Sequence, residues 1–167
     1  MLGPSRGAQL GRCRRDPSVR SPIVSEVDVE LRPFAADDRL HVVSLWRRCD
    51  LVRPWNDPDL DIDRKLADSP DGFVVGVLDD CIVPAMMVGY DGHRGWINYL
   101  AVDPDLRGRG LGRRMVEHAE AWLLGQGCPK LNLQVRATNT DVLAFYESLG
   151  YAVDAAVSLG KRLIHDA

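Results

Sequence analysis

The stretch WINYLAVDPDLRGRGLGRRMVEHAEAWLLG, residues 96–125, reads as a strand, a glycine–arginine loop and a helix. In residues 96–102 both alternating sets of positions are apolar or aromatic, which predicts a central strand covered on both faces. Asp103-Pro104 should end this strand, because proline has no backbone N–H to donate to a neighbour. From Leu111 onward apolar residues recur at helical spacing up to Gly125, so we predict a helix over 111–125.

The loop between strand and helix has the features of an anion-binding site. Glycines alternate at Gly108, Gly110 and Gly112, and without a Cβ the backbone can approach a ligand closely. The N–H groups that open a helix lack intrahelical acceptors and favour an anion. Four arginines lie within the same eight residues: Arg107, Arg109, Arg113 and Arg114. We interpret residues 107–113, with Leu111 among them, as a diphosphate-binding loop; a glycine-rich turn with solvated arginines is the alternative.

Two motifs identify which diphosphate this loop would bind. The glycine order is G-x-G-x-G rather than the G-x-G-x-x-G of dinucleotide folds, and no P-loop lysine follows. LAVDPDLRGRGLGRR, residues 100–114, is similar to the acyl-CoA-binding motif of the GNAT superfamily of N-acetyltransferases. VRATNTDVLAFYESLGY, residues 135–151, resembles the second signature of that family, in its RimI-like form. The resemblance covers about residues 28–164, and the pieces RPWNDP, GYDGHRG, GCPK and SLGKRLI are most similar to the bacterial YpeA type.

This resemblance implies the GNAT fold, of the α/β class: a mostly antiparallel mixed sheet with two splayed parallel strands, flanked by helices. Besides the central strand we expect strands over 27–33, 72–78, 82–90, 130–135, 151–153 and 157–164. We expect helices from residue 38 to about 49, from residue 58 past Leu66, over 111–125 and over 140–149. Asp79-Asp80 should form a hairpin turn, and Pro84 should mark a bulge or an unpaired position.

The family pattern also implies where the acyl donor binds. In GNAT proteins acyl-CoA lies where two parallel strands separate, which here would be residues 96–102 and 130–135. The backbone groups of Leu100, Ala101 and Val102 would hold the pantetheine, and Asn139 would contact CoA. Tyr146 would donate a proton to the departing thiolate, as the catalytic acid. The residues alone also allow a helix cap at Asn139 and a core position for Tyr146.

The acceptor side departs from the family pattern. Gln134 stands where RimI-type enzymes have a glutamate base, and residues 96–102 contain no acid. A base acting through water, or an acceptor of low pKa, is therefore implied. The connection before the second helix contains Arg53, Trp55 and Asp57, which with Asn98 are our candidate acceptor-binding residues. For Asp57, which precedes Pro58, a helix cap is the strong alternative.

We expect an enzyme that moves the acetyl group of acetyl-CoA to a primary amine by direct attack in a ternary complex. The alternative is a non-catalytic acyl-CoA-binding sensor or regulatory module, which the loss of the glutamate at Gln134 favours and the retained Tyr146 opposes. The sequence leaves open the identity of the amine, small molecule or protein, and the acyl-chain preference. It also leaves open the oligomeric state, a homodimer included.

Composition indicates the number of domains and argues against several other classes of function. With 46% apolar and 27% charged residues in 167, one domain over residues 26–167 is expected, after a disordered arginine-rich tail over 1–25. A transit peptide or a mis-assigned start are alternatives for that tail. Residues 26–167 carry a net charge of −7, which argues against nucleic-acid binding, and no apolar run of 18 residues suggests a membrane span. The four histidines and four cysteines form no ligand pattern, so we expect no metal, and the scattered cysteines suit a cytoplasmic protein.

Overall fold

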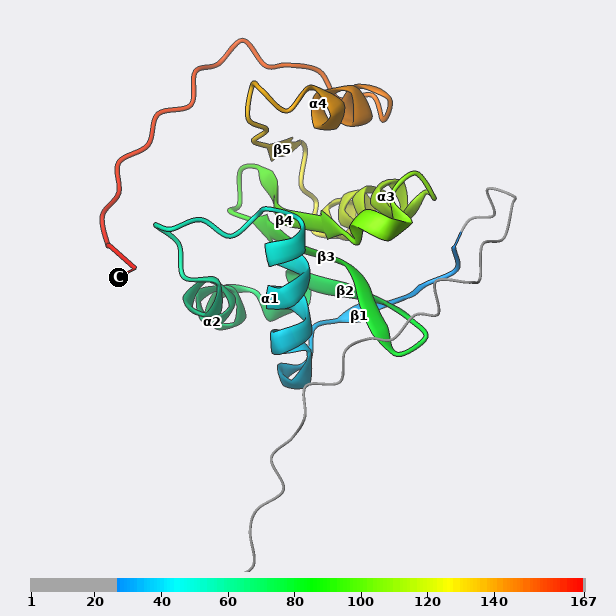
Figure 1. The fold of residues 1–167 in the computed structure, drawn as a ribbon. Coiled ribbons are helices and arrows are strands. Elements are labelled where there is room, and N and C mark those ends of the chain that lie inside the picture. Colours follow the sequence, from blue (N-terminus) through cyan, green and yellow to red (C-terminus); the bar gives the residue numbers. More distant parts are fainter. Residues whose placement is uncertain (1–26, 167) are drawn as a thin grey trace, which may run out of the picture.

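The computed structural model describes residues 27–166, so the predicted tail over residues 1–25 lies outside the described residues. The chain forms one five-stranded sheet with helices on both faces (Figure 1). The strands are β1 (Glu30–Pro33), β2 (Phe73–Leu78), β3 (Cys81–Tyr90), β4 (Gly95–Val102) and β5 (Leu131–Leu133). The helices are α1 (Arg39–Arg48), α2 (Pro58–Asp68), α3 (Leu111–Gly125) and α4 (Thr140–Glu147). No helix within residues 27–166 is long and apolar enough to cross a membrane.

The sheet has the order β1-β2-β3-β4-β5, so neighbours in the sheet are also neighbours in the chain. The first four strands pair antiparallel, whereas β4 and β5 pair parallel. A parallel pair needs a crossover connection, and α3 provides it. The predicted fold class, a mostly antiparallel mixed sheet flanked by helices, is confirmed.

Alternation along the strands decides which helices each face contacts. In β2, Phe73 and Val75 belong to the cluster with Trp46 of α1, whereas Val74 belongs to the cluster with Met115 of α3. Helices α1 and α2 therefore cover one face, and α3 and α4 the other (Figure 1). Because both faces are buried, the central strands are apolar at nearly every position.

The hairpin between β2 and β3 confirms two predictions made from single residues. Asp79 and Asp80 have φ of 50° and 60°, as expected for a tight hairpin turn. The pairing passes from Val75–Ala85 to Val77–Ile82, so β3 has one extra residue at Pro84, where a bulge was predicted.

The prediction of two strands over 151–153 and 157–164 is wrong. These residues have no regular secondary structure, and the apolar side chains expected to face a neighbouring strand are 70–91% exposed: Val153, Val157, Leu159, Leu163 and Ile164. The physical reason lies in β5, which is three residues long rather than the six predicted and pairs only with β4. Side-chain alternation cannot supply backbone partners, so the C-terminal segment leaves α4 and arcs toward α2 (Figure 1).

Candidate active site

The two parallel strands separate after a short contact. Pairing runs from Gly95–Leu131 to Ile97–Leu133, after which β4 continues to Val102 while the chain leaves β5. Leu100, Ala101 and Val102 therefore lie in the part of β4 that has no partner on the β5 side, as the family resemblance implied. On the opposite edge β4 stays paired with β3 at two of these residues, Ala101 with Ala85 and Val102 with Pro84.

A bulge reshapes β4 within this unpaired part. The β3–β4 pairing passes from Met87–Asn98 to Ala85–Ala101, so Tyr99 and Leu100 together oppose Met86. Tyr99 has a φ of 53°, a left-handed conformation that is costly for an aromatic residue. Bulges that redirect a side chain are frequent next to active sites.

The glycine–arginine loop is anchored at both ends by buried leucines. Leu106 and Leu111 pack with Val83 in a small cluster of buried side chains. Between them Gly108 and Gly110 have φ of 74° and 80°, and a Cβ built on Gly108 would meet nothing within 4 Å. The loop thus presents open backbone at the N-terminus of α3, a geometry that suits an anionic ligand.

The charges of the loop are mostly uncompensated. Arg107, Arg109 and Arg113 are exposed, and within residues 27–166 none of them pairs with a carboxylate. Arg114 instead pairs with Asp28, their charged atoms being 3.0 Å apart. Three of the four predicted arginines are therefore available to a phosphate.

Gly112 has a packing role in addition to the predicted one. A Cβ added there would lie 3.1 Å from the ring of Phe145. Gly112 thus allows α4 to pack closely against the first turn of α3. As a result Phe145, which precedes Tyr146 in α4, lies beside the glycine–arginine loop.

One contact of the loop was not foreseen. The thiol of Cys49, at the end of α1, donates to the carbonyl of Val102 at 3.3 Å, and Arg107 Nε donates to the same oxygen at 3.4 Å. Burial raises the pKa of the Cys49 thiol above its ordinary value, although Arg107 is close by. One of the carbonyls assigned to pantetheine already has partners within the chain.

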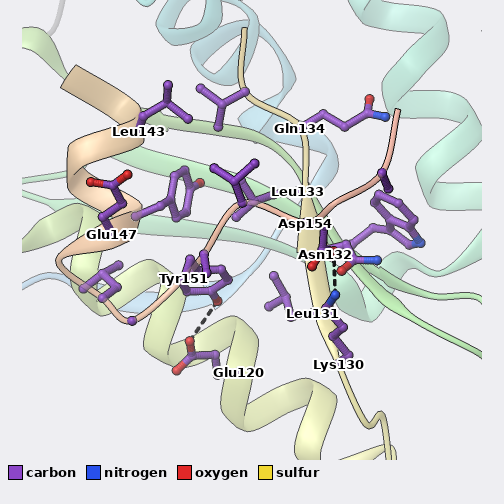
Figure 2. Close-up of a pocket in the computed structure, with 18 of the residues that line it drawn as sticks. Glu120, Lys130, Leu131, Asn132, Leu133, Gln134, Leu143, Glu147, Tyr151 and Asp154 are labelled. Atoms are coloured by element: carbon purple, nitrogen blue, oxygen red, sulfur yellow. Dashed lines mark hydrogen bonds and ion pairs between the residues drawn. The ribbon is translucent and has the colours of Figure 1, made fainter. Parts of the chain in front are cut away.

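Tyr146 lies in the last turn of α4. It is 8% exposed, and its ring contacts Phe145 and Tyr151 edge-on at 5.0 and 5.4 Å. Burial raises the pKa of Tyr146 to about 12, so the phenol stays protonated. The side chain lines a cavity of ≈ 1180 Å³ between α4, β5 and the C-terminal segment, and Figure 2 shows Leu133 and Leu143 at the same cavity.

Asn139 occupies the N-cap position of α4, but its side chain makes no capping hydrogen bond. The predicted side-chain cap is therefore absent, and the exposed amide is left for the other predicted role, a contact with CoA. The amide of Gln134 donates to Ser158 Oγ of the C-terminal segment at 2.6 Å.

The acceptor candidates occupy different environments. Arg53 is committed to Asp50, with a closest N–O distance of 2.7 Å, and Trp55 is 55% exposed. Asp57 caps α2 by accepting from the amides of residues 59 and 60, which confirms the cap. Asn98 is exposed on β4, beside the bulge.

The C-terminal segment crosses this acceptor loop. Arg162 donates to the carbonyl of Trp55 at 2.7 Å and to Asn56 Oδ1 at 3.1 Å. Arg64 of α2 pairs with Asp166 at 2.5 Å. Sequence reasoning missed Asn56 and Arg162, because no local pattern connects residues more than 100 positions apart.

Comparison with known proteins agrees with this geometry. A model of the Acetyltransferase (GNAT) family matches residues 40–151. The chain belongs to the GNAT family of acetyltransferases. This GNAT protein is 49% identical over 138 residues to an acetyltransferase of Pectobacterium atrosepticum and 50% identical over 139 residues to one of Sodalis glossinidius. Each alignment covers 83% of this chain and 98% of the relative. The protein is therefore an acyltransferase; the YpeA type stays a prediction.

Solved structures share the fold at lower identity. Ard1 from Thermoplasma volcanium has a TM-score of 0.65 at 21% identity, covering 76% of this chain and 84% of its own. AAC(6')-Iy in complex with a CoA-containing bisubstrate analog has a TM-score of 0.65 at 17% identity, covering 81% and 99%. GNAT acetyltransferases use acetyl-CoA. Within residues 27–166 no group of three or more potential ligand side chains could hold a metal ion.

Proposed function

We propose that this GNAT protein transfers the acetyl group of acetyl-CoA to a primary amine by direct attack in a ternary complex. The observation that carries the proposal is the separation of β4 from β5 directly before a loop of open backbone and unpaired arginines. The separation provides backbone groups for an extended ligand arm, and the loop provides an anion site at the end of that arm.

Residues of three elements would hold the cosubstrate. Arg107, Arg109 and Arg113, with the backbone from Gly108 through Gly112, would bind the diphosphate. The backbone edge at Leu100, Ala101 and Val102, which β5 leaves unpaired, would bind the pantetheine amides, although the Val102 carbonyl already accepts from Cys49 and Arg107. Asn139, which does not use its side chain as a cap, would add a contact from α4.

Tyr146 would act on the leaving group. We assign to its buried phenol, on α4, the role of hydrogen-bond donor to the departing sulfur of CoA. Because burial raises its pKa to about 12, the phenol keeps its proton at neutral and mildly alkaline pH. We therefore expect Tyr146 to stabilise the thiolate by donating a hydrogen bond, with full proton transfer less favourable than for an ordinary tyrosine near 10.

On the acceptor side we propose that Trp55 and Asn98 contact the amine-bearing molecule and that Arg53 and Asp57 act mainly by holding the loop. Arg53 and Asp57 are engaged by Asp50 and by the first turn of α2, whereas Trp55 and Asn98 are exposed. A non-catalytic acyl-CoA sensor is the second candidate, favoured by the engagement of Gln134 with Ser158.

Release of free CoA from acetyl-CoA, measured with a panel of amines and peptides, tests the proposal. Turnover stimulated by at least one amine is expected, whereas acetyl-CoA binding without stimulated turnover would favour the sensor.

The loop assignment is tested separately by calorimetry with CoA. Gly110→Val should abolish binding, because a β-branched side chain at a φ of 80° would occupy the approach to the backbone. Gly92→Val is the matched control, since Gly92 has a similar φ of 86° in the β3–β4 turn and no neighbour within 4 Å. CoA affinity within about twofold of wild type for Gly110→Val would contradict the assignment.

A further inference from the structure

Tyr99 of β4 makes a short hydrogen bond to a residue of α2. Its phenol donates to Asp61 Oδ2 at 2.6 Å, and Asn56 Nδ2 donates to the phenol oxygen at 3.3 Å. A hydroxyl oxygen has two lone pairs, so this oxygen retains one acceptor position after binding Asn56. The pair thus combines a carboxylate, a relay hydroxyl and one vacant acceptor site.

The position of Tyr99 joins this pair to the proposed active site. Tyr99 immediately precedes Leu100, within the bulge and within the part of β4 that β5 leaves unpaired. Its ring stacks on Trp46 at 4.2 Å, on the face of the sheet covered by α1 and α2. The left-handed φ of 53° shows that the surrounding packing holds the tyrosine in this strained conformation.

Asp61 also borders an open cavity of ≈ 630 Å³ between α2 and the C-terminal segment. Asn56 and Arg64 line the same cavity, together with residues 160–164. A molecule entering from this side would meet Asp61 on the face opposite to α3 and its loop.

We infer that Tyr99 and Asp61 form the proton-accepting pair for the acceptor amine, with the phenol oxygen contacting the amine and Asp61 acting through the phenol. The inference rests on the proposed function, since it assigns the acceptor half of that reaction. In this inference Asp61 provides the carboxylate that position 134, a glutamine, and residues 96–102 do not provide.

The step conserves atoms and charge. As the neutral amine attacks the thioester carbon, a C–N bond forms, the nitrogen becomes positively charged and its N–H becomes acidic. That proton passes to the Tyr99 oxygen while the phenol gives its own proton to Asp61 Oδ2. The C–S bond breaks, the sulfur leaves with the electron pair, and Tyr146 donates a hydrogen bond to it. Asp61 then loses its proton to solvent through the open cavity.

The charges around the pair suit this role. Arg64 contacts Asp61 Oδ1 at 3.0 Å, which leaves Oδ2 to Tyr99 and Asn56, and Arg64 is itself shared with Asp166. Arg162 is held by Trp55 and Asn56. Burial, together with the carboxylates of Asp61 and Asp166, raises the pKa of Tyr99 to about 12, so the phenol is a protonated relay and not a phenolate.

The test compares Tyr99→Phe and Asp61→Asn with Tyr151→Phe. Tyr151 is a matched control because its phenol also donates to a carboxylate, Glu120, at 2.8 Å, between α3 and the C-terminal segment (Figure 2). With an amine that the wild type acetylates, Tyr99→Phe and Asp61→Asn should each lower kcat about 100-fold while calorimetric acetyl-CoA affinity stays within about twofold. Tyr151→Phe should keep kcat within about twofold.

The pH profile separates proton acceptance from a structural role. Without the pair, only hydroxide or free water can take the proton, so kcat of Asp61→Asn should keep rising at alkaline pH where that of wild type has levelled off. Unchanged kcat and pH profile in both variants, with wild-type turnover intact, would overturn the inference alone. Loss of acetyl-CoA binding in both variants would also overturn it, by showing a structural role. Absence of amine-stimulated turnover in the wild type would instead contradict the proposed function.

Discussion

Two regions of the molecule differ in how they are held together. Residues 27–128, with β1–β4 and α1–α3, contain every buried side chain of the three clusters on the two faces of the sheet except Tyr146. Among residues 129–166, with β5, α4 and the C-terminal segment, only Tyr146 is buried. Side-chain contacts join this second region to the first, such as the hydrogen bond from the Tyr151 phenol to Glu120 at 2.8 Å and the ion pair between Arg64 and Asp166 at 2.5 Å.

The candidate active site lies where the two regions meet. The loop with Gly110 and the bulge with Tyr99 come from the first region, whereas Tyr146 and Asn139 come from the second. Segments with few buried apolar contacts open at low free-energy cost. A well-packed region therefore carries most of the groups proposed to bind the acyl donor, and a region with fewer buried side chains contributes Asn139 and Tyr146 to the same site.

The largest expected effect is on stability. Phe73 is fully buried and stacks on Phe34 at 4.3 Å, so Phe73→Ala should lower the free energy of unfolding by about 3–5 kcal/mol. Leu159, also a large apolar residue but 91% exposed, is the control from the second region. Leu159→Ala should change the free energy of unfolding by less than about 0.5 kcal/mol. Urea unfolding measures both, and equal losses would show that the second region is packed as tightly as the first.

The next largest expected effect is on catalysis, from a change at Tyr146, the buried residue of the second region. Tyr146→Phe keeps the ring and removes the hydroxyl, so kcat should fall about 100-fold with acetyl-CoA affinity little changed. Unchanged turnover would assign Tyr146 to packing alone. Because burial raises its pKa to about 12, the wild type should not lose Tyr146-dependent activity between pH 8 and 10, whereas an ordinary phenol would begin to lose its proton near 10. A decline in kcat centred near pH 10 would contradict the raised pKa.

The smallest effect compares two helix starts, one in each region. Asp57 accepts two backbone hydrogen bonds at the start of α2, so Asp57→Ala should cost about 1 kcal/mol of stability. Asn139 makes no such bond at the start of α4, so Asn139→Ala should cost less than about 0.5 kcal/mol and should instead weaken CoA binding. Thermal unfolding and CoA calorimetry on both variants check the contrast, which fails if Asn139→Ala destabilises the protein as much as Asp57→Ala.

Local signals predicted much of the first region. The helix predicted over 111–125 has the same first and last residue as α3, because apolar periodicity and the flanking glycines act within one or two helical turns. The Asp79-Asp80 turn and the bulge at Pro84 followed from the backbone limits of single residues. The family resemblance supplied the separation of β4 from β5, which periodicity alone does not predict.

The sequence by itself determined the glycine–arginine loop, the central strand and the cap at Asp57, since each depends on neighbours a few positions away. Only the tertiary structure decided that residues 151–164 form no strand, because strand formation depends on backbone partners that the short β5 does not offer. Only the tertiary structure brought Asp61 to Tyr99, 38 positions apart in the chain. Their contact depends on the packing of α2 against the sheet and on the bulge that turns Tyr99 toward it, and neither is a property of adjacent residues.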